Sequence, residues 1–158
     1  MSGYNTSRYK TQSVAMLYFY GALALFVAQV AFGTLAGLIY VLPNTLSELL
    51  PFSIVRMIHT NALVVWLLLG FMGATYYLLP EEAQTELYST KLAIIQFWLF
   101  FIAAAVAVVG YLFRIHEGRE FLEQPFAIKV GIVVVVLIFL FNITMTSLKG
   151  RKTTVTNI

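Results

Sequence analysis

The sequence has no cysteine and only two histidines among its 158 residues. The absence of cysteine excludes disulfides, thiolate catalysis, iron–sulfur clusters and covalently attached heme. Any cofactor that this chain holds must therefore be bound by histidine, carboxylate or backbone groups.

Charged residues are also scarce, at 11% of the chain, against 60% hydrophobic residues and a mean hydropathy of +0.85. These values lie far from those of soluble domains. The net charge of +3 comes from ten Lys and Arg that are spread over ends and loops, so no nucleic-acid-binding pattern is present. The composition predicts an all-α, polytopic membrane protein whose surroundings are a lipid bilayer.

Four apolar segments are each long enough to cross a hydrocarbon core of roughly 30 Å, which takes about 20 residues. They cover approximately residues 14–42, 54–79, 91–113 and 126–148. We expect residues 14–148 to form a four-helix transmembrane region between a terminal segment at 1–13 and another at 149–158. Strands are excluded because the segments lack period-two alternation and far exceed strand length. The four prolines lie between the segments, where helices are expected to stop: Pro43, Pro51, Pro80 and Pro125.

The distribution of cations predicts the orientation. One side of the expected bundle carries six of them: Arg8, Lys10, Lys91, Lys149, Arg151 and Lys152. The other side carries four: Arg56, Arg114, Arg119 and Lys129. Both chain ends are therefore predicted to be cytoplasmic. In that orientation His59 lies about five residues, or roughly 8 Å, below the outer surface, and the charged loop of residues 114–124 lies over the same side.

Arg56 and His59 are the only basic residues of the second apolar segment. Ionisable side chains in membrane segments are costly and point by default to a function. At a spacing of three they face the same way, so His59 can ligate heme iron while Arg56 meets a carboxylate near the surface. The structural alternative is a His satisfied by a carbonyl of a neighbouring helix and an Arg that reaches the headgroups.

Other small or acidic residues have plainer interpretations. Glu81, Glu82 and Glu86 form a short acidic loop that we expect to be solvated. Gly33 and Gly37 form a small-xxx-small pair, which usually indicates close helix packing. Neither feature by itself predicts a functional site.

Three segments of the sequence carry a resemblance: PFSIVRMIHTNALVVWLLLGFMGATYYLLPEE, EGREFLEQP and FLFNITMTSLKGRKTTVTN. They closely resemble the start of the large subunit of bacterial nitric oxide reductase, in the heme-copper oxidase superfamily, and the resemblance covers nearly the whole chain. It implies the first third of a twelve-helix, subunit I type fold in a bacterial inner membrane. The activity it implies is reduction of nitric oxide to nitrous oxide in denitrification, with electrons from cytochrome c.

The resemblance also implies roles for residues at matching positions. His59, in RMIHTN, would be one of two axial ligands of the low-spin heme b, close to the periplasmic side. Glu120, in GRE, would be a calcium ligand beside the heme propionates, which would pair with Arg119 and, by position, with Arg56. Glu123 would join Glu120 in an acidic cluster implicated in proton delivery. Because two histidines saturate the iron, this heme would relay electrons and would not bind nitric oxide.

A ligating histidine normally donates its other ring N–H to a fixed acceptor. Gly33 and Gly37 lie near the outer end of the first apolar segment, at about the depth of His59. We therefore expect this glycine pair to let a carbonyl of the first segment accept the N–H of His59.

The departures from the family limit what this chain can do alone. The complete subunit needs further histidines for its second axial position, its high-spin heme and its non-heme iron, whereas here only His116 remains, an expected solvated loop residue. No catalytic residue is therefore expected in this chain. We expect an N-terminal fragment or truncated paralogue whose partners are the remainder of the large subunit and a membrane-anchored cytochrome c subunit. The loop at residues 113–117 is also shorter than is usual in the family.

Two alternatives remain open. The first is a stand-alone b-type heme membrane protein, in which two copies of His59 would complete the ligation. The second is a cofactor-free membrane accessory protein, in which His59 is a satisfied core residue.

Overall fold

The computed structural model describes residues 9–42, 47 and 50–155, the last five of them by their backbone alone. Within this range the chain forms helices α1 (Lys10–Val41), α3 (Phe52–Glu82), α4 (Thr90–Leu112) and α5 (Phe126–Val155), and no strand. All four helices are long and apolar enough to cross a membrane. Even α4, with 23 residues, extends about 35 Å at about 1.5 Å per residue. The prediction of an all-α chain with four membrane-spanning helices is confirmed.

The helix boundaries lie close to the ends of the apolar segments. Each agrees to within four residues, except that α5 continues seven residues past its predicted end. Pro51 directly precedes α3, and Pro125 directly precedes α5, where its carbonyl accepts the N–H of Ile128 at 2.9 Å. These two prolines therefore lie between helices, as predicted, and each stands at the start of the next helix. Pro43 and Arg8 lie outside the described residues.

The expectation that Pro80 stops a helix is wrong. Pro80 lies inside α3, two residues before the helix ends. A proline lacks an amide N–H, so it removes one hydrogen bond and crowds the preceding turn, but only two helical residues follow it here. The N–H of Ala83 still donates to the carbonyl of Leu79 at 2.9 Å, so the last turn closes around the proline.

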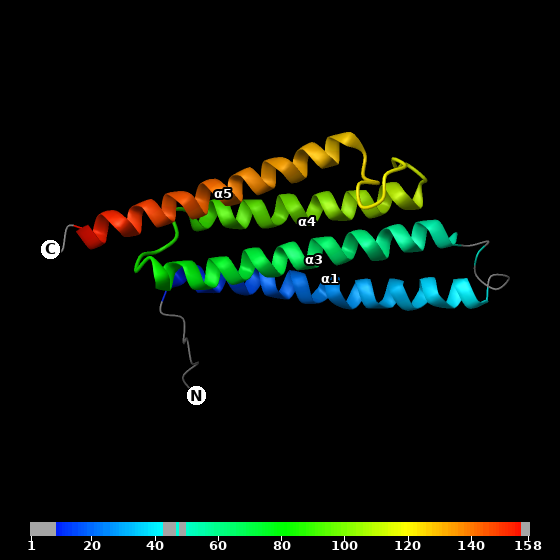
Figure 1. Cartoon of the computed structure of the whole chain (residues 1–158), viewed down its shortest axis with the longest axis horizontal. Coiled ribbons are helices and arrows are strands. Elements are labelled where there is room, and N and C mark those ends of the chain that lie inside the picture. The colour runs from blue at the N-terminus through cyan, green and yellow to red at the C-terminus, as the bar shows by residue number, and fades with distance from the viewer. Residues whose placement is uncertain (1–8, 43–46, 48–49, 156–158) are drawn as a thin grey trace, which may run out of the picture.

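The helices run up and down, so that successive helices are antiparallel (Figure 1). α1 packs most extensively against α3, and α4 against α5, whereas contacts between these pairs are fewer. The chain is therefore two helical hairpins that lie side by side. α1 and α4 begin, and α3 and α5 end, at one end of the bundle, which we call the Glu86 end. The opposite end, where α3 and α5 begin, is the Arg56 end.

Aromatic packing joins the two hairpins. Tyr18 of α1 and Phe97 of α4 meet edge to face, with ring centroids 5.2 Å apart. Gly21 of α1 lies beside them, and a Cβ there would be 2.7 Å from the Phe97 ring, so this approach requires glycine. The outer faces carry large exposed apolar side chains, among them Tyr20 and Phe71. Such faces suit lipid or additional helices.

At the Glu86 end, the loop between α3 and α4 caps the start of α1. The Glu86 carboxylate accepts the backbone N–H groups of Lys10 (2.8 Å) and Thr11 (3.2 Å) and the Thr11 hydroxyl (2.6 Å). Burial raises the pKa of the Glu86 carboxyl, but these hydrogen bonds and the Lys10 charge outweigh it, so the pKa lies below its ordinary value. Glu81 accepts the Gln12 amide at 2.7 Å. Glu81 and Glu82 are exposed, as expected for solvated residues, but they lie in the last turn of α3 and not in a loop. Glu81 and the half-buried Glu86 also satisfy donors at the start of α1.

The same end holds α5 against the start of α4. Asn142, fully buried on α5, donates to the Ser89 carbonyl at 3.0 Å and accepts the Ser89 N–H at 3.1 Å. Thr146, one turn later, accepts the N–H of Tyr88 at 2.9 Å. The Ser89 hydroxyl in turn accepts the N–H of Leu92 and caps α4. Side chains of α5 thus replace water as partners for the loop backbone.

Candidate functional site

His59 lies on α3, seven residues after the helix begins, or about 10 Å along its axis. Its Nδ1 is 2.8 Å from the backbone carbonyl oxygen of Gln29 on α1, and 3.3 Å from the Gln29 side-chain nitrogen. A carbonyl oxygen only accepts, so the shorter contact requires that Nδ1 carry the proton. The neutral imidazole then has an unprotonated Nε2, whose lone pair can bind a metal.

Gly33 makes room for this hydrogen bond. In an α-helix the residue four positions after Gln29 donates to the Gln29 carbonyl, and that residue is Gly33. A Cβ on Gly33 would lie 2.6 Å from Cε1 and 2.7 Å from Nδ1 of His59, whereas a Cβ on Gly37 would meet nothing within 4 Å. The expected glycine-exposed carbonyl is therefore confirmed for Gly33. It is wrong for Gly37, because this side of α1 faces open space one turn further on.

Arg56 contacts the loop of residues 113–125 that joins α4 to α5. Its Nη1 is 2.6 Å from Oε1 of Glu120, and its Nη2 is 4.0 Å from Oε1 of Glu123. Arg56 meets a carboxylate near the surface, that of Glu120, whereas its pairing with a heme propionate stays a prediction. Arg56 thus packs toward the α4–α5 loop, while His59, one turn later, packs against α1.

Local contacts shape this loop around the carboxylates of Glu120 and Glu123. The Glu117 N–H donates to the Glu123 carbonyl at 2.7 Å, and Lys129 of α5 pairs with the Glu117 carboxylate. The hydrogen bond from Lys129 lowers the pKa of the Glu117 carboxyl below its ordinary value. Phe121 has a φ of 62°, a left-handed conformation that is costly for a bulky residue. This turn separates Glu120, whose side chain is 65% exposed, from Glu123, at 3%.

Glu123 is a buried carboxylate held by amide side chains. Its Oε2 accepts the Nδ2 of Asn61 at 2.9 Å, and the same Nδ2 lies 2.9 Å from the Met57 carbonyl. The Oδ1 of Asn61 accepts the Nε2 of Gln124. Sequence reasoning missed both amides. A signal for Asn61 was present, because it is the only amide in its apolar segment and stands two residues after His59.

Arg119 and His116 stand apart from this cluster. Both are exposed on the α4–α5 loop, as expected for His116, and Arg119 makes no salt bridge to any described residue. No group of three or more His, Asp or Glu side chains in the described residues could hold a metal ion. Calcium takes about six to eight oxygen ligands, so Glu120 does not form a calcium site with this part of the chain alone. The residues present fit one axial position of a heme iron, through Nε2 of His59.

The sequence is similar to those of known proteins. Residues 13–158 match the family model described as Cytochrome C and Quinol oxidase polypeptide I. A nitric oxide reductase subunit from Stutzerimonas stutzeri is 53% identical over 173 aligned residues, which cover 100% of this chain and 36% of that protein. Cytochrome c oxidase subunit 1 of Rhodobacter capsulatus is 45% identical over 38 residues, which cover 24% of this chain and 7% of that protein.

The chain thus spans just over a third of the curated relative that it matches along its whole length. The alignment is longer than the chain, so that relative has additional residues within the matched range. The resemblance carried by the motifs is confirmed, and so is the expected subunit I type of fold. The chain belongs to the cytochrome c and quinol oxidase polypeptide I family.

Proposed function

We propose that this chain is the N-terminal part of a nitric oxide reductase large subunit and that His59 is an axial ligand of its low-spin heme b. The observation that carries the proposal is the hydrogen bond from His59 Nδ1 to the Gln29 carbonyl, which leaves Nε2 free for iron. The 53% identity along the whole chain to a protein named as a nitric oxide reductase subunit supports it. The complete subunit would reduce nitric oxide to nitrous oxide in denitrification, with electrons from cytochrome c.

In this proposal His59 serves electron transfer. A low-spin heme with two histidine ligands supplies electron transfer when bound, because no iron position is left open. The chain itself holds the tautomer and the plane of the imidazole, since Gln29 accepts the ring N–H and Gly33 leaves space beside the ring. The second histidine, the high-spin heme and the non-heme iron would belong to the remainder of the large subunit.

The charged cluster would serve the polar edge of that heme. Arg56 carries the paired N–H groups that carboxylates prefer, so it would bind a propionate, as would Arg119 from the loop. Glu120, exposed beside Arg56, would be a calcium ligand together with oxygens from other groups. Glu123, buried and bonded to Asn61, would join Glu120 in delivering protons from the outer side.

The expected partners are the remainder of the large subunit and a membrane-anchored cytochrome c subunit in the bacterial inner membrane. Large apolar side chains on the outer faces, such as Phe71 at 70% and Tyr20 at 65% exposure, support coverage by helices or lipid. Residues 1–13 and 149–158 would be cytoplasmic, with His59 near the periplasmic side. That α1 begins and α5 ends at the same end of the bundle agrees with this orientation.

A reduced-minus-oxidised optical spectrum of the complete protein, purified from membranes, tests the proposal. We expect His59→Ala to lose the low-spin b-type signal. His116→Ala is the matched control, since His116 is exposed on a loop, and it should keep the signal. A low-spin signal of full intensity in His59→Ala would refute the proposed ligand.

A further inference from the structure

Three buried oxygen atoms at the Arg56 end have no hydrogen-bond partner in the described part of the chain: Tyr111 Oη, Glu123 Oε1 and Gln124 Oε1. Their side chains are 0%, 3% and 8% exposed, respectively. Buried polar groups in native proteins are nearly always paired, with protein or with ordered water. Glu123 and Gln124 both bond to Asn61, and Gln124 lines one cavity with Tyr111, so the three atoms indicate a missing partner.

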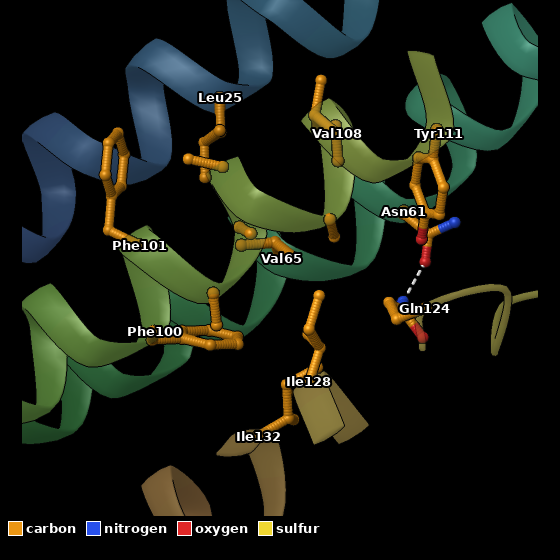
Figure 2. A pocket seen from close by; sticks show the side chains of 15 residues that line it. Leu25, Asn61, Val65, Phe100, Phe101, Val108, Tyr111, Gln124, Ile128 and Ile132 are labelled. Carbon is orange, nitrogen blue, oxygen red and sulfur yellow. Dashed lines mark hydrogen bonds between the residues drawn. The ribbon is translucent and has the colours of Figure 1, made fainter. Parts of the chain in front are cut away.

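A cavity of about 100 Å³ that is lined by residues of all four helices reaches Tyr111 and Gln124. Figure 2 shows Asn61, Tyr111 and Gln124 together at one end of the cavity, with Phe100, Phe101 and Ile132 toward the other. The lining is otherwise apolar and includes a series of alanines from α4. The cavity is thus apolar along most of its length and polar at one end, with room there for water.

The polar end offers one unused donor and two unused acceptors. Both polar atoms of Asn61 are engaged, since Nδ2 donates to Glu123 Oε2 and Oδ1 accepts from Gln124. The Tyr111 hydroxyl can donate. Gln124 Oε1 can only accept, and the same holds for Glu123 Oε1 when the Glu123 carboxyl is ionised. A ligand that accepts once and donates twice would satisfy all three atoms.

We propose that a buried water molecule occupies this end of the cavity. It accepts the O–H of Tyr111 and donates to Gln124 Oε1 and Glu123 Oε1, which gives it the three partners typical of buried water. The water completes a hydrogen-bonded network from Arg56 and Glu123 at the surface loop, through Asn61, to Tyr111 on α4. This site stands on the geometry of the cluster and does not rest on the proposed heme function.

Other occupants fit less well. A metal cation would find only a few oxygens here, fewer than the roughly six to eight that calcium takes. An apolar gas or a lipid tail would fill the apolar part of the cavity and leave all three oxygens unpaired. Water is the occupant that matches the donors and acceptors present.

An experimental structure at high resolution of the complete protein is the direct test. We expect a compact density peak within hydrogen-bond distance of Tyr111 Oη, Gln124 Oε1 and Glu123 Oε1. A second data set under xenon pressure should show xenon, if anywhere, only in the apolar part. Xenon at the polar end, an empty polar end, or a protein group from elsewhere bonded to these oxygens would overturn the proposal.

The sign of a melting-temperature change gives an independent test. If water is bound, Tyr111→Phe removes a hydrogen bond, and the melting temperature should fall by about 2–4 °C. If the site is dry, the same change removes an unpaired buried hydroxyl, so the melting temperature should stay constant or rise. Tyr40→Phe is the control, because Tyr40 is 78% exposed. A melting temperature of Tyr111→Phe that equals or exceeds that of the natural chain would count against the bound water.

Discussion

At the Glu86 end of the bundle the carboxylates and amides that join the helices are paired, whereas at the Arg56 end three buried oxygens are not. Glu86 accepts three hydrogen bonds, and Asn142 both gives and accepts one with Ser89. Glu123 and Gln124 each keep an oxygen without a hydrogen-bond partner among the described residues. A complete set of partners stabilises a fold, and an incomplete set indicates a place where something else binds. The difference agrees with a stabilising role for the Glu86 end and with the site that we propose at the Arg56 end.

The largest effect is expected at Gly33, on the functional side of this comparison. In Gly33→Val a branched side chain would occupy space where even a single Cβ would lie 2.6 Å from the His59 ring. Displacing the ring from the Gln29 carbonyl should lower low-spin heme content by about tenfold or more, measured as heme per protein. Gly37→Val is the control, because open space surrounds that position and heme should be retained. Equal loss in both variants would show that α1 simply tolerates no branched residue there.

The next effect is expected at the other end, in Glu86→Ala. Removing the acceptor for the start of α1 should lower the free energy of unfolding by about 1–2 kcal/mol. Unfolding in detergent by heat or denaturant measures it, and heme content should not change. Glu82→Ala, at an exposed neighbouring carboxylate, should have little effect on either quantity. Heme loss without loss of stability in Glu86→Ala would reverse the roles assigned to the two ends.

A smaller effect is expected from pH. The Glu86 pKa is lower in the folded chain than its ordinary value of 4.5, so the unfolded chain takes up protons first as pH falls. The stabilisation is therefore complete above about pH 4.5 and is lost as pH falls through the lower, folded pKa. The difference in melting temperature between the natural chain and Glu86→Ala should shrink over that range. A difference that stays constant down to about pH 3 would contradict the role of an ionised Glu86.

The smallest effect on stability is expected from Arg56→Met. The Arg56–Glu120 pair is partly exposed, with side chains 37% and 65% accessible, so its loss should cost about 0–1 kcal/mol. The free energy of unfolding measures this, with Arg56→Lys as the charge-conserving control. A loss as large as that of Glu86→Ala would mean that the Arg56 end also stabilises the fold.

The four helices were predictable because a long apolar run is a local property of the sequence. The contacts of Glu86 were not, since its partners Lys10 and Thr11 stand about 75 positions away. Local reasoning also failed at Pro80, where the outcome depends on how little helix remains after the proline. Sequence patterns thus found the helices and missed what ties their ends together.

The candidate site was predictable in its residues but not in its arrangement. The motifs singled out His59, Glu120 and Glu123, yet the conformation of the loop, with its left-handed residue Phe121, leaves Glu120 exposed and buries Glu123. Likewise, the rotation of α1 against α3 decides that Gly33, and not Gly37, lies against His59. Both outcomes depend on tertiary packing, which cannot be deduced from the spacing of residues in the sequence.

The division into two hairpins implies an order of assembly during biosynthesis. Both partners of the Gln29–His59 hydrogen bond belong to the first hairpin, α1 with α3, so this bond can form before the ribosome has made α4. Glu120 and Glu123 come with the second hairpin, and they close onto Arg56 and Asn61 only when that hairpin docks. The imidazole is therefore oriented first, and the charged loop above it is added last.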